Sequence, residues 1–323
     1  IGASAFYGTG LTEVVIPENV SYVGSSAFAN GQLIQVEFEQ GTKYIKTTIG
    51  SSAFEGCRNL KEIQLSENVN YLSQNIIKGT AIESLTIPKS VESCYASSGE
   101  GPLTGAEYLK EIIFEEGMKA IPEKIAYNAK SIEQVIIPET VEVIGKQAFY
   151  GAEKLSQVKL PSILTKIGSE AFQGTGLTSV TIPDRVTEID DQAFDGIAKL
   201  TSVTLPQSLT RIGNYAFYGA TNLTEIALPA TLESIGSNAF SGTGLTEVVI
   251  PENVSYVGSF AFANSQLTRV EFEQGTRYIK IIIDSSAFEG CRNLKKIQLS
   301  ENVNYLGQNI IKGTAIESLT IPK

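Results

Sequence analysis

Every 22 or 23 residues the chain repeats one pattern of apolar residues, glycine and proline. The copy that begins at Ile144 holds an Ile-Gly pair, an Ala-Phe pair, a glycine, spaced apolar residues and a Leu-Pro pair. A period of this length is typical of a solenoid, in which each unit buries its apolar face only against its neighbours. About 14 units of 22–27 residues can be assigned over 1–323, which predicts one continuous solenoid and no separate domains.

A second, longer repeat lies on top of the first. Residues 1–89 align with residues 235–323, and 76 of these 89 positions are identical. Such a block indicates an array that grew by copying whole segments. The first and last residues fall inside the pattern, so we expect both ends to be truncated within the array. Residues 1–6 hold neither a basic nor an apolar segment, and no signal peptide is expected in this segment.

Within a unit, three short elements are predicted. Residues 177–183 alternate apolar and polar side chains and end in proline, which indicates a strand. Residues 186–189 alternate again and predict a shorter second strand. Residues 191–196 have the pattern of a single helical or 3₁₀ turn that ends at glycine. The phenylalanine of this turn recurs in most units and is expected to stack as a column inside the solenoid, with Ile77 and Ile311 replacing it in two units.

The pattern resembles the BspA-like leucine-rich repeats, also called the Treponema-type class. The residues that carry the resemblance are Leu-x-x-Val-x-Ile-Pro, followed by Val-x-x-Ile-Gly-x-x-Ala-Phe-x-Gly, and they are almost complete over 185–204. Residues 55–60 supply the cysteine variant of the motif. Proline stands at Pro17, Pro183 and Pro251, where commoner leucine-rich repeats place a buried asparagine.

The resemblance implies a leucine-rich-repeat solenoid of the α/β type, dominated by strands. It implies a curved right-handed solenoid with a parallel concave sheet, short second strands, and 3₁₀ or helical turns on the convex side. Members of the family are typically secreted or cell-surface proteins of bacteria, and several are implicated in adhesion to host matrix proteins or to other microbes. An extracellular, cell-surface location is therefore expected for this chain, and the family has no catalytic motif to transfer.

Composition excludes several classes of partner. The formal net charge is −10, whereas binding to nucleic acid or to an anionic membrane surface requires a surplus of Lys and Arg. No run of 18 consecutive apolar residues is present, so no membrane insertion is expected in this segment. An extracellular protein or glycan is the expected partner, and the chain is expected to be monomeric in solution.

Residue types limit the chemistry in the same way. The chain has no histidine, which removes the Ser-His-Asp and Cys-His arrangements and any histidine metal site, and we expect no cofactor and no metal. Its three cysteines have neither zinc nor disulfide-framework spacing. Cys57 and Cys291 follow a motif glycine and are expected to be small buried residues, and Cys94 is expected to be a packing thiol.

Outward strand positions are therefore the main candidates for a binding surface. Each unit has two such positions in its first strand, and none of them is aromatic, so a tight site for a single partner is not expected there. Ile113 and Ile136 are predicted to be neighbours and to form the best apolar patch, flanked by Glu111 and Gln134. The alternative is that these β-branched residues only stabilise the sheet.

Loops offer a second set of candidates, because variation and exposure coincide there. Tyr44 and Tyr278 lie in two long connections, and Glu100 lies in the glycine-rich loop 97–102. The sequence favours non-enzymatic adhesion through many weak contacts. The alternative function is a passive stalk that displays another domain, and an enzyme is the least favoured class.

Overall fold

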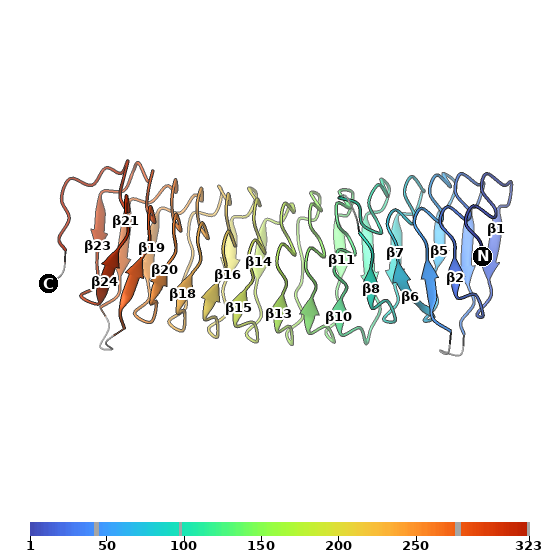
Figure 1. Ribbon diagram of the computed structural model, residues 1–323, viewed down its shortest axis with the longest axis horizontal. Coiled ribbons are helices and arrows are strands. Elements are labelled where there is room, and N and C mark those ends of the chain that lie inside the picture. Colours follow the sequence, from blue (N-terminus) through green and yellow to red (C-terminus); the bar gives the residue numbers. More distant parts are fainter. Residues whose placement is uncertain (42–44, 97–98, 275–278, 322–323) are drawn as a thin grey trace. The chain divides into compact units, whose positions relative to one another are not determined.

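The computed structural model describes residues 1–41, 45–96, 99–274 and 279–321. In these residues the chain forms 24 strands of two to four residues and no helix. It divides into two compact units, Ile1–Ile163 and Leu164–Lys323. Strands of successive turns run side by side along each unit (Figure 1). The architecture is thus the solenoid that the repeat predicts.

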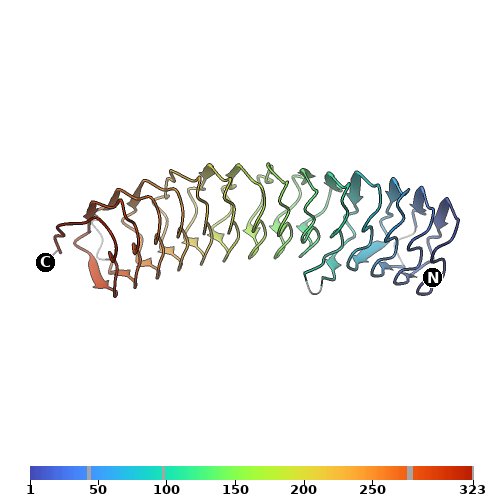
Figure 2. The ribbon, with the colours of Figure 1, turned by 90° about the horizontal axis from the view of Figure 1, so that it is seen from above.

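Each turn of the chain contributes to two sets of strands, which lie on different sides of the stack (Figure 2). The first strand precedes the motif proline, and the second includes the isoleucine or valine of the Ile-Gly position. In the unit 1–163 the first strands are β1 (Glu13–Ile16), β3 (Gln35–Phe38), β5 (Glu62–Gln64), β7 (Ser84–Ile87), β9 (Glu111–Phe114) and β11 (Gln134–Ile136). The second strands there are β2 (Tyr22–Val23), β4 (Thr47–Ile49), β6 (Val69–Leu72), β8 (Ser93–Cys94), β10 (Ala120–Ile121) and β12 (Val143–Ile144).

The unit 164–323 has the same two sets. Its first strands are β14 (Ser179–Thr181), β16 (Ser202–Thr204), β19 (Glu247–Ile250), β21 (Arg269–Phe272) and β23 (Lys296–Gln298). Its second strands are β13 (Lys166–Ile167), β15 (Glu188–Ile189), β17 (Arg211–Ile212), β18 (Ser234–Ile235), β20 (Tyr256–Val257), β22 (Ile281–Ile283) and β24 (Val303–Leu306).

Strands pair only with strands of the same set, and the pairs are parallel. First strands form the short sheets β1-β3-β5 and β7-β9-β11 in one unit, and β14-β16 and β19-β21-β23 in the other. Second strands form the sheets β2-β4-β6-β8 and β10-β12 in the unit 1–163. In the unit 164–323 they form one longer series, β13-β15-β17-β18-β20-β22-β24. Equivalent residues of successive turns are therefore in register.

The core of each unit is a column of phenylalanine rings. In the unit 164–323, neighbouring rings from Phe172 to Phe288 stack at 5.3–5.5 Å between centroids and within 10° of parallel. Phe6, Phe28 and Phe54 stack in the same way in the other unit, at 5.0 and 5.5 Å. The predicted column is confirmed.

Three smaller residues continue the column between Phe54 and Phe149. Ile77, Leu103 and Ala126 hold its positions and are fully buried. A side chain from the end of β9 lies beside this smaller stretch, because the Phe114 ring meets the Phe149 ring edge-on at 6.2 Å. The stack remains filled although the repeat departs from phenylalanine.

The turn that carries the phenylalanine is not helical, which corrects the predicted 3₁₀ or helical turn. Alternate amides donate within the turn, as Tyr150 N does to the Gln147 carbonyl at 3.2 Å. The amides between them donate to the next turn, as Ala126 N does to the Ala148 carbonyl at 2.8 Å. Gln147 has a positive φ of 56°, and a helix cannot continue through a left-handed residue. The expected glycine end is confirmed at Gly151, whose φ is 68°.

The glycine of the Ile-Gly pair has a different role. A Cβ atom on Gly145 would lie 2.7 Å from the backbone nitrogen of Glu123 in the neighbouring turn. Only glycine permits this approach without a shift of the backbone.

Three expected first strands are absent among the described residues. Residues 157–159, 225–227 and 318–320 form no strand. In the first two, an outward position holds a poor strand former, Lys159 or Ala227. The third lies in the last turn of the sequence, where Ser318 to Ile321 repeats the residues of β7.

Candidate binding surfaces

The predicted apolar patch lies on the sheet β7-β9-β11. Register pairs Glu111 with Gln134 and Ile113 with Ile136, so the four residues form two adjacent rows as expected. Ile136 is 42% exposed, while Ile113 is half-buried. Thr86 of β7 continues the apolar row, which therefore ends in a hydroxyl.

Polar contacts surround this patch. Ser84 Oγ donates to Glu111 Oε2 at 2.9 Å, which holds the carboxylate against the sheet. Beside it, Lys110 Nζ lies 2.9 Å from Glu83 Oε2, and this hydrogen bond raises the pKa of Lys110. Two isoleucines amid paired charges make a small apolar area, and single exposed apolar residues are normal on protein surfaces. The geometry brings the predicted residues together without making a pocket of them.

Glu100 lines an open groove of about 570 Å³ at the turn edge of the unit 1–163. Asn75 Nδ2 donates to Glu100 Oε2 at 2.9 Å, and Lys78 Nζ lies 3.9 Å from its other oxygen. Across the groove Lys130 is paired with Glu153 at 2.7 Å. The charges of Glu100 and Lys130 are thus paired with opposite charges or hydrogen-bond donors. Within the described ranges no group of three or more His, Cys, Asp or Glu is placed to hold a metal ion.

Tyr44 and Tyr278, the two other predicted candidates, lie outside the described residues.

The thiols are free and have no feature of a reactive group. Cys57 and Cys291 are buried as expected, and their Sγ atoms lie 3.0 and 3.1 Å from the carbonyls of Phe28 and Phe262. Burial raises the pKa of both thiols and of Cys94, which is partly exposed. A nucleophilic cysteine needs the opposite shift.

The candidates predicted from the sequence came from the first strands and the loops. They did not include the exposed tyrosines that lie on or directly after the second strands. Tyr22 of β2 is 46% exposed and Tyr305 of β24 is 51% exposed, and Tyr95 directly after β8 is 49% exposed. The sequence itself indicates that such a tyrosine is exposed. In Val-Ser-Tyr-Val-Gly (20–24) successive side chains point to opposite faces of the strand, so the tyrosine before the buried valine points outward.

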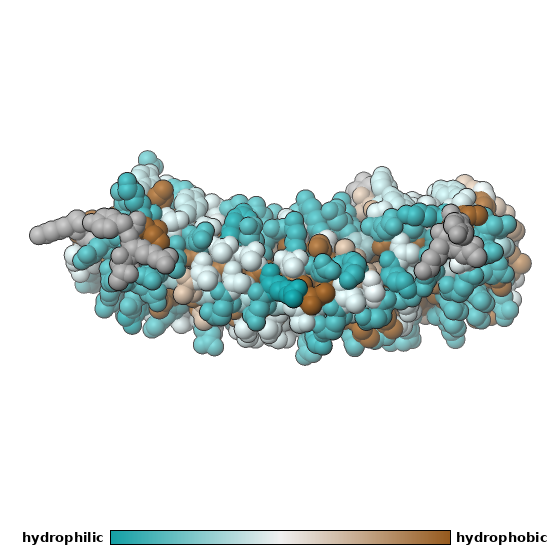
Figure 3. Space-filling model, turned by 90° about the horizontal axis from the view of Figure 1, so that it is seen from below, coloured by the Kyte–Doolittle hydropathy of each residue, from teal (hydrophilic) through white to brown (hydrophobic). Residues whose placement is uncertain are grey.

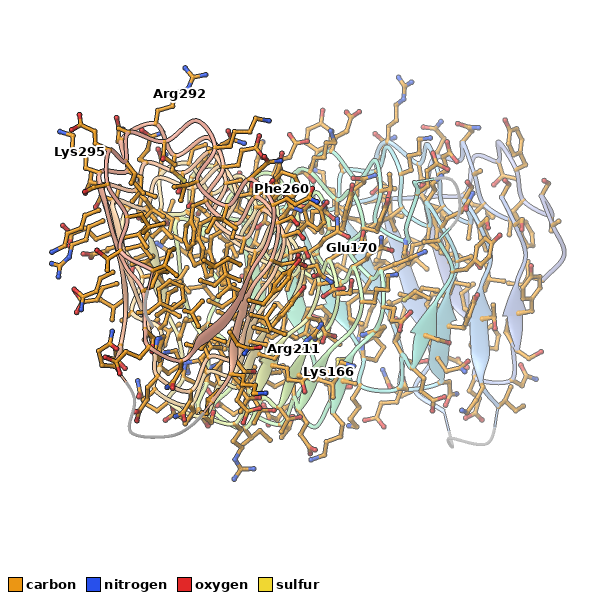
Figure 4. The ribbon with its side chains drawn as sticks, turned by 60° about the vertical axis from the view of Figure 1, so that its left-hand side comes forward. Lys166, Glu170, Arg211, Phe260, Arg292 and Lys295 are labelled. Carbon is orange, nitrogen blue, oxygen red and sulfur yellow. The ribbon has the colours of Figure 1, made fainter. Side chains whose placement is uncertain are left out.

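Other second strands of the unit 164–323 carry charges at the same outward position. Lys166 and Arg211 project from one side of this unit (Figure 4). Arg211 contacts Glu188 at 3.6 Å and Asp191 at 3.2 Å. This stretch is a row of partly exposed ion pairs, each of which contributes little to stability. On the face drawn in Figure 3, hydrophobic side chains form scattered patches among hydrophilic ones.

Comparison with known families agrees with the repeat. The family model described as the BspA type leucine rich repeat region matches in 6 copies, over residues 1–99, 46–122, 99–200, 188–283 and 210–323. None of the curated proteins matches the chain. No enzymatic family is indicated, and within the described residues no helix is long and apolar enough to cross a membrane.

Solved structures share the fold at low sequence identity. A leucine-rich repeat protein from Bacteroides ovatus is 23% identical with a TM-score of 0.68, and the match covers 97% of this chain and 79% of that one. The pneumococcal vaccine antigen PcpA is 18% identical with a TM-score of 0.54, over 97% of this chain and 90% of that one. A leucine rich cell surface protein from Faecalibacterium prausnitzii is 21% identical with a TM-score of 0.45, over 98% and 81%. The first two likenesses show a leucine-rich-repeat solenoid.

Proposed function

Because the chain belongs to the BspA-type leucine-rich repeat family, we propose that it is a non-enzymatic binding scaffold of a bacterial surface protein. In this proposal it acts outside the cell in adhesion, engaging host matrix proteins, glycans or other cells. The observation that carries the proposal is the register of the strands. Equivalent outward side chains of successive turns line up in rows, as in the Glu111 and Ile113 rows of β7-β9-β11.

Such rows suit binding through repeated contacts. Each outward residue is separated from its equivalent by one strand spacing, about 4.8 Å, so a partner with a repeating surface meets the same side chains many times. Each contact can be weak, since linked contacts multiply into avidity. The surface location rests on the family, whose members are typically secreted or exposed on bacterial cells.

The test is to immobilise the chain and to measure binding of fibronectin, fibrinogen, mucin and whole epithelial cells by surface plasmon resonance and cell counting. Saturable binding to at least one of them is expected. The heat-unfolded chain serves as the control for non-specific capture. Absence of saturable binding to all four would contradict adhesion.

A passive stalk is the second candidate, and the duplicated block favours it. Residues 1–89 and 235–323 share 76 of 89 positions, and a spacer needs length more than a particular surface. Exchange of the outward residues distinguishes the two functions. A variant with Glu111→Ser, Ile113→Thr, Gln134→Ser and Ile136→Thr keeps its full biological function if the chain is a stalk. An adhesin that uses this face loses binding.

A further inference from the structure

The outward positions of the second strands in the unit 1–163 form one row. Register pairs Tyr22 with Thr48, Thr48 with Tyr71, and Tyr71 with Ser93. Tyrosines therefore occupy alternate strands, β2 and β6, and we call this set the first tyrosine row. Since neighbouring strands lie about 4.8 Å apart, the two tyrosines are separated by roughly 9.6 Å along the row.

The same arrangement recurs in the unit 164–323. Tyr256 of β20 is in register with Ile282 of β22, which is in register with Tyr305 of β24. Ile282 is 40% exposed, so this second tyrosine row presents more apolar surface than the first. Each unit thus holds two outward tyrosines on alternate strands.

An ion pair lies beside the first row, and a carboxylate lies beside the second. Lys46, which precedes β4, donates to both carboxylate oxygens of Glu92 at 3.1 and 3.0 Å. The hydroxyl of Tyr256 donates to Asp284 at 3.2 Å, and burial, followed by this contact, raises the pKa of Tyr256. Burial raises the pKa of Tyr71 as well. Both hydroxyls thus stay neutral, and the rows themselves hold no charged side chain.

These properties select the class of ligand. Of the four tyrosines, Tyr22 and Tyr305 are exposed, and Tyr71 and Tyr256 are half-buried. Aromatic rings in a line stack on flat partners, which include nucleobases and sugar rings. A net charge of −10 disfavours nucleic acid, which leaves sugars. In an extended β-1,4-linked glycan, alternate sugars present the same ring face, and the spacing of that repeat is close to two strand spacings. Hydroxyl groups of Tyr, Thr48 and Ser93 can bond the sugar hydroxyls at the edge of the stack.

We infer that the two tyrosine rows bind an uncharged, extended β-linked glycan, with alternate sugar rings stacked on alternate tyrosines. The inference deepens the proposed function, on which it rests, by naming the class of ligand and the face that binds it.

The direct test is isothermal titration calorimetry of the whole chain with cellohexaose and with chitohexaose, and α-linked maltohexaose as the comparison. Binding of at least one β-linked hexasaccharide is expected with a Kd on the order of 0.1–1 mM, and one hexasaccharide for each row. Maltohexaose is expected to bind at least about tenfold more weakly, because its curved chain does not keep the spacing.

Variants locate the site. Tyr22→Ala with Tyr71→Ala should abolish binding at the first row and halve the stoichiometry, and Tyr256→Ala with Tyr305→Ala should do the same at the second. The equivalent Phe variants keep the rings and should bind within about threefold of the parent. Tyr108→Ala is the matched control, because Tyr108 is 57% exposed and lies outside both rows. Circular dichroism of each variant confirms that it is folded.

Three results would overturn the inference: no binding of either β-linked hexasaccharide at about 10-fold the expected Kd, unchanged binding after loss of all four tyrosines, or equal binding of maltohexaose. Adhesion to fibronectin, mucin or cells that survives loss of the four tyrosines also rejects this site, yet leaves the proposed function standing. Failure of the proposed function would give a different result, because the unmodified chain itself would then bind none of fibronectin, fibrinogen, mucin or epithelial cells.

Discussion

At the scale of single residues, the stacked phenylalanines pack successive turns against one another inside each unit. Phe217 is fully buried, and its ring lies 5.5 Å from Phe194 and 5.4 Å from Phe240. A ring in the middle of the column contacts neighbours on both sides. Its loss therefore leaves a cavity between two turns that rigid strands cannot close.

Phe217→Ala is expected to lower the free energy of unfolding by about 3–5 kcal/mol. Urea denaturation followed by circular dichroism measures the change. Tyr218→Ala is the control, because the adjacent Tyr218 is 42% exposed and its removal should cost less than about 0.5 kcal/mol. Equal losses from both variants would show that the column does not dominate the packing.

Asp195 is an unusual residue for a core turn, because it is only 8% exposed. Gln173 and Gln192 donate to its Oδ2 at 2.7 and 3.3 Å. Burial is the largest effect on this carboxyl and raises its pKa, and the nearby charge of Glu170 adds to the shift. The folded state therefore holds a proton at Asp195 to a higher pH than the unfolded chain does.

The sign of the resulting pH dependence follows from proton linkage. Stability contributed by a protonated Asp195 is present in full below the unfolded pKa and is lost as pH rises through the raised folded pKa. Asp195→Asn cannot ionise, so its stability relative to the parent should increase between about pH 3 and pH 7. Urea denaturation across this range measures the difference, and exposed Asp184→Asn is the control. A difference that does not change with pH would contradict the assignment.

At the scale of elements, close approach of successive turns explains the Ile-Gly pair. A Cβ atom on Gly145 would meet the backbone of the previous turn, and a Cβ atom on Gly236 would meet that of its own previous turn at 2.6 Å. Gly2 holds the same position in the first turn of the sequence, where no preceding turn is present to meet its Cβ atom, so it serves as an unpacked control.

Gly145→Ala is expected to destabilise the chain by about 1–3 kcal/mol, because a backbone must move to admit the methyl group. Gly2→Ala should change stability by less than about 0.5 kcal/mol. Thermal denaturation of the two variants provides the comparison. A milder effect at Gly145 than at Gly2 would reject the steric explanation.

At the scale of the whole molecule, each unit is built from turns that pack on their neighbours. In each unit a turn pairs with the turns before and after it, so stability is close to a sum of turns and their interfaces. The two compact units, Ile1–Ile163 and Leu164–Lys323, each contain their own strands and phenylalanine stack. Damage to one turn should therefore stay local.

Hydrogen exchange tests this expectation. In the Phe217→Ala variant, amides in the turns around Phe217 should exchange faster, while those around Phe28 and Phe54 should exchange as in the parent, because local openings involve neighbouring turns only. Mass spectrometry of peptic fragments measures the rates. Uniformly faster exchange along the entire chain would indicate a single cooperative unit instead.

The period of 22 or 23 residues by itself determined the solenoid, the two sets of strands and the phenylalanine column, because these depend on contacts that most turns repeat. It did not determine the form of the turn, since the left-handed residue at Gln147 and its equivalents is not glycine and has no common side chain. The candidate rows around Ile113 and Ile136 followed from alternation, and register confirmed that they are adjacent.

Tertiary structure alone decided where strands form and where aromatic side chains meet. Ser84–Ile87 is strand β7, whereas residues 157–159, at the same position of the repeat, form no strand, and a strand exists only when a neighbour completes its hydrogen bonds. Tyr22 and Tyr71 are 49 positions apart in the sequence, and only the pairing of β2, β4 and β6 places them in one row. Local pattern sets which face of a strand points outward, but pairing between turns sets which residues share that face.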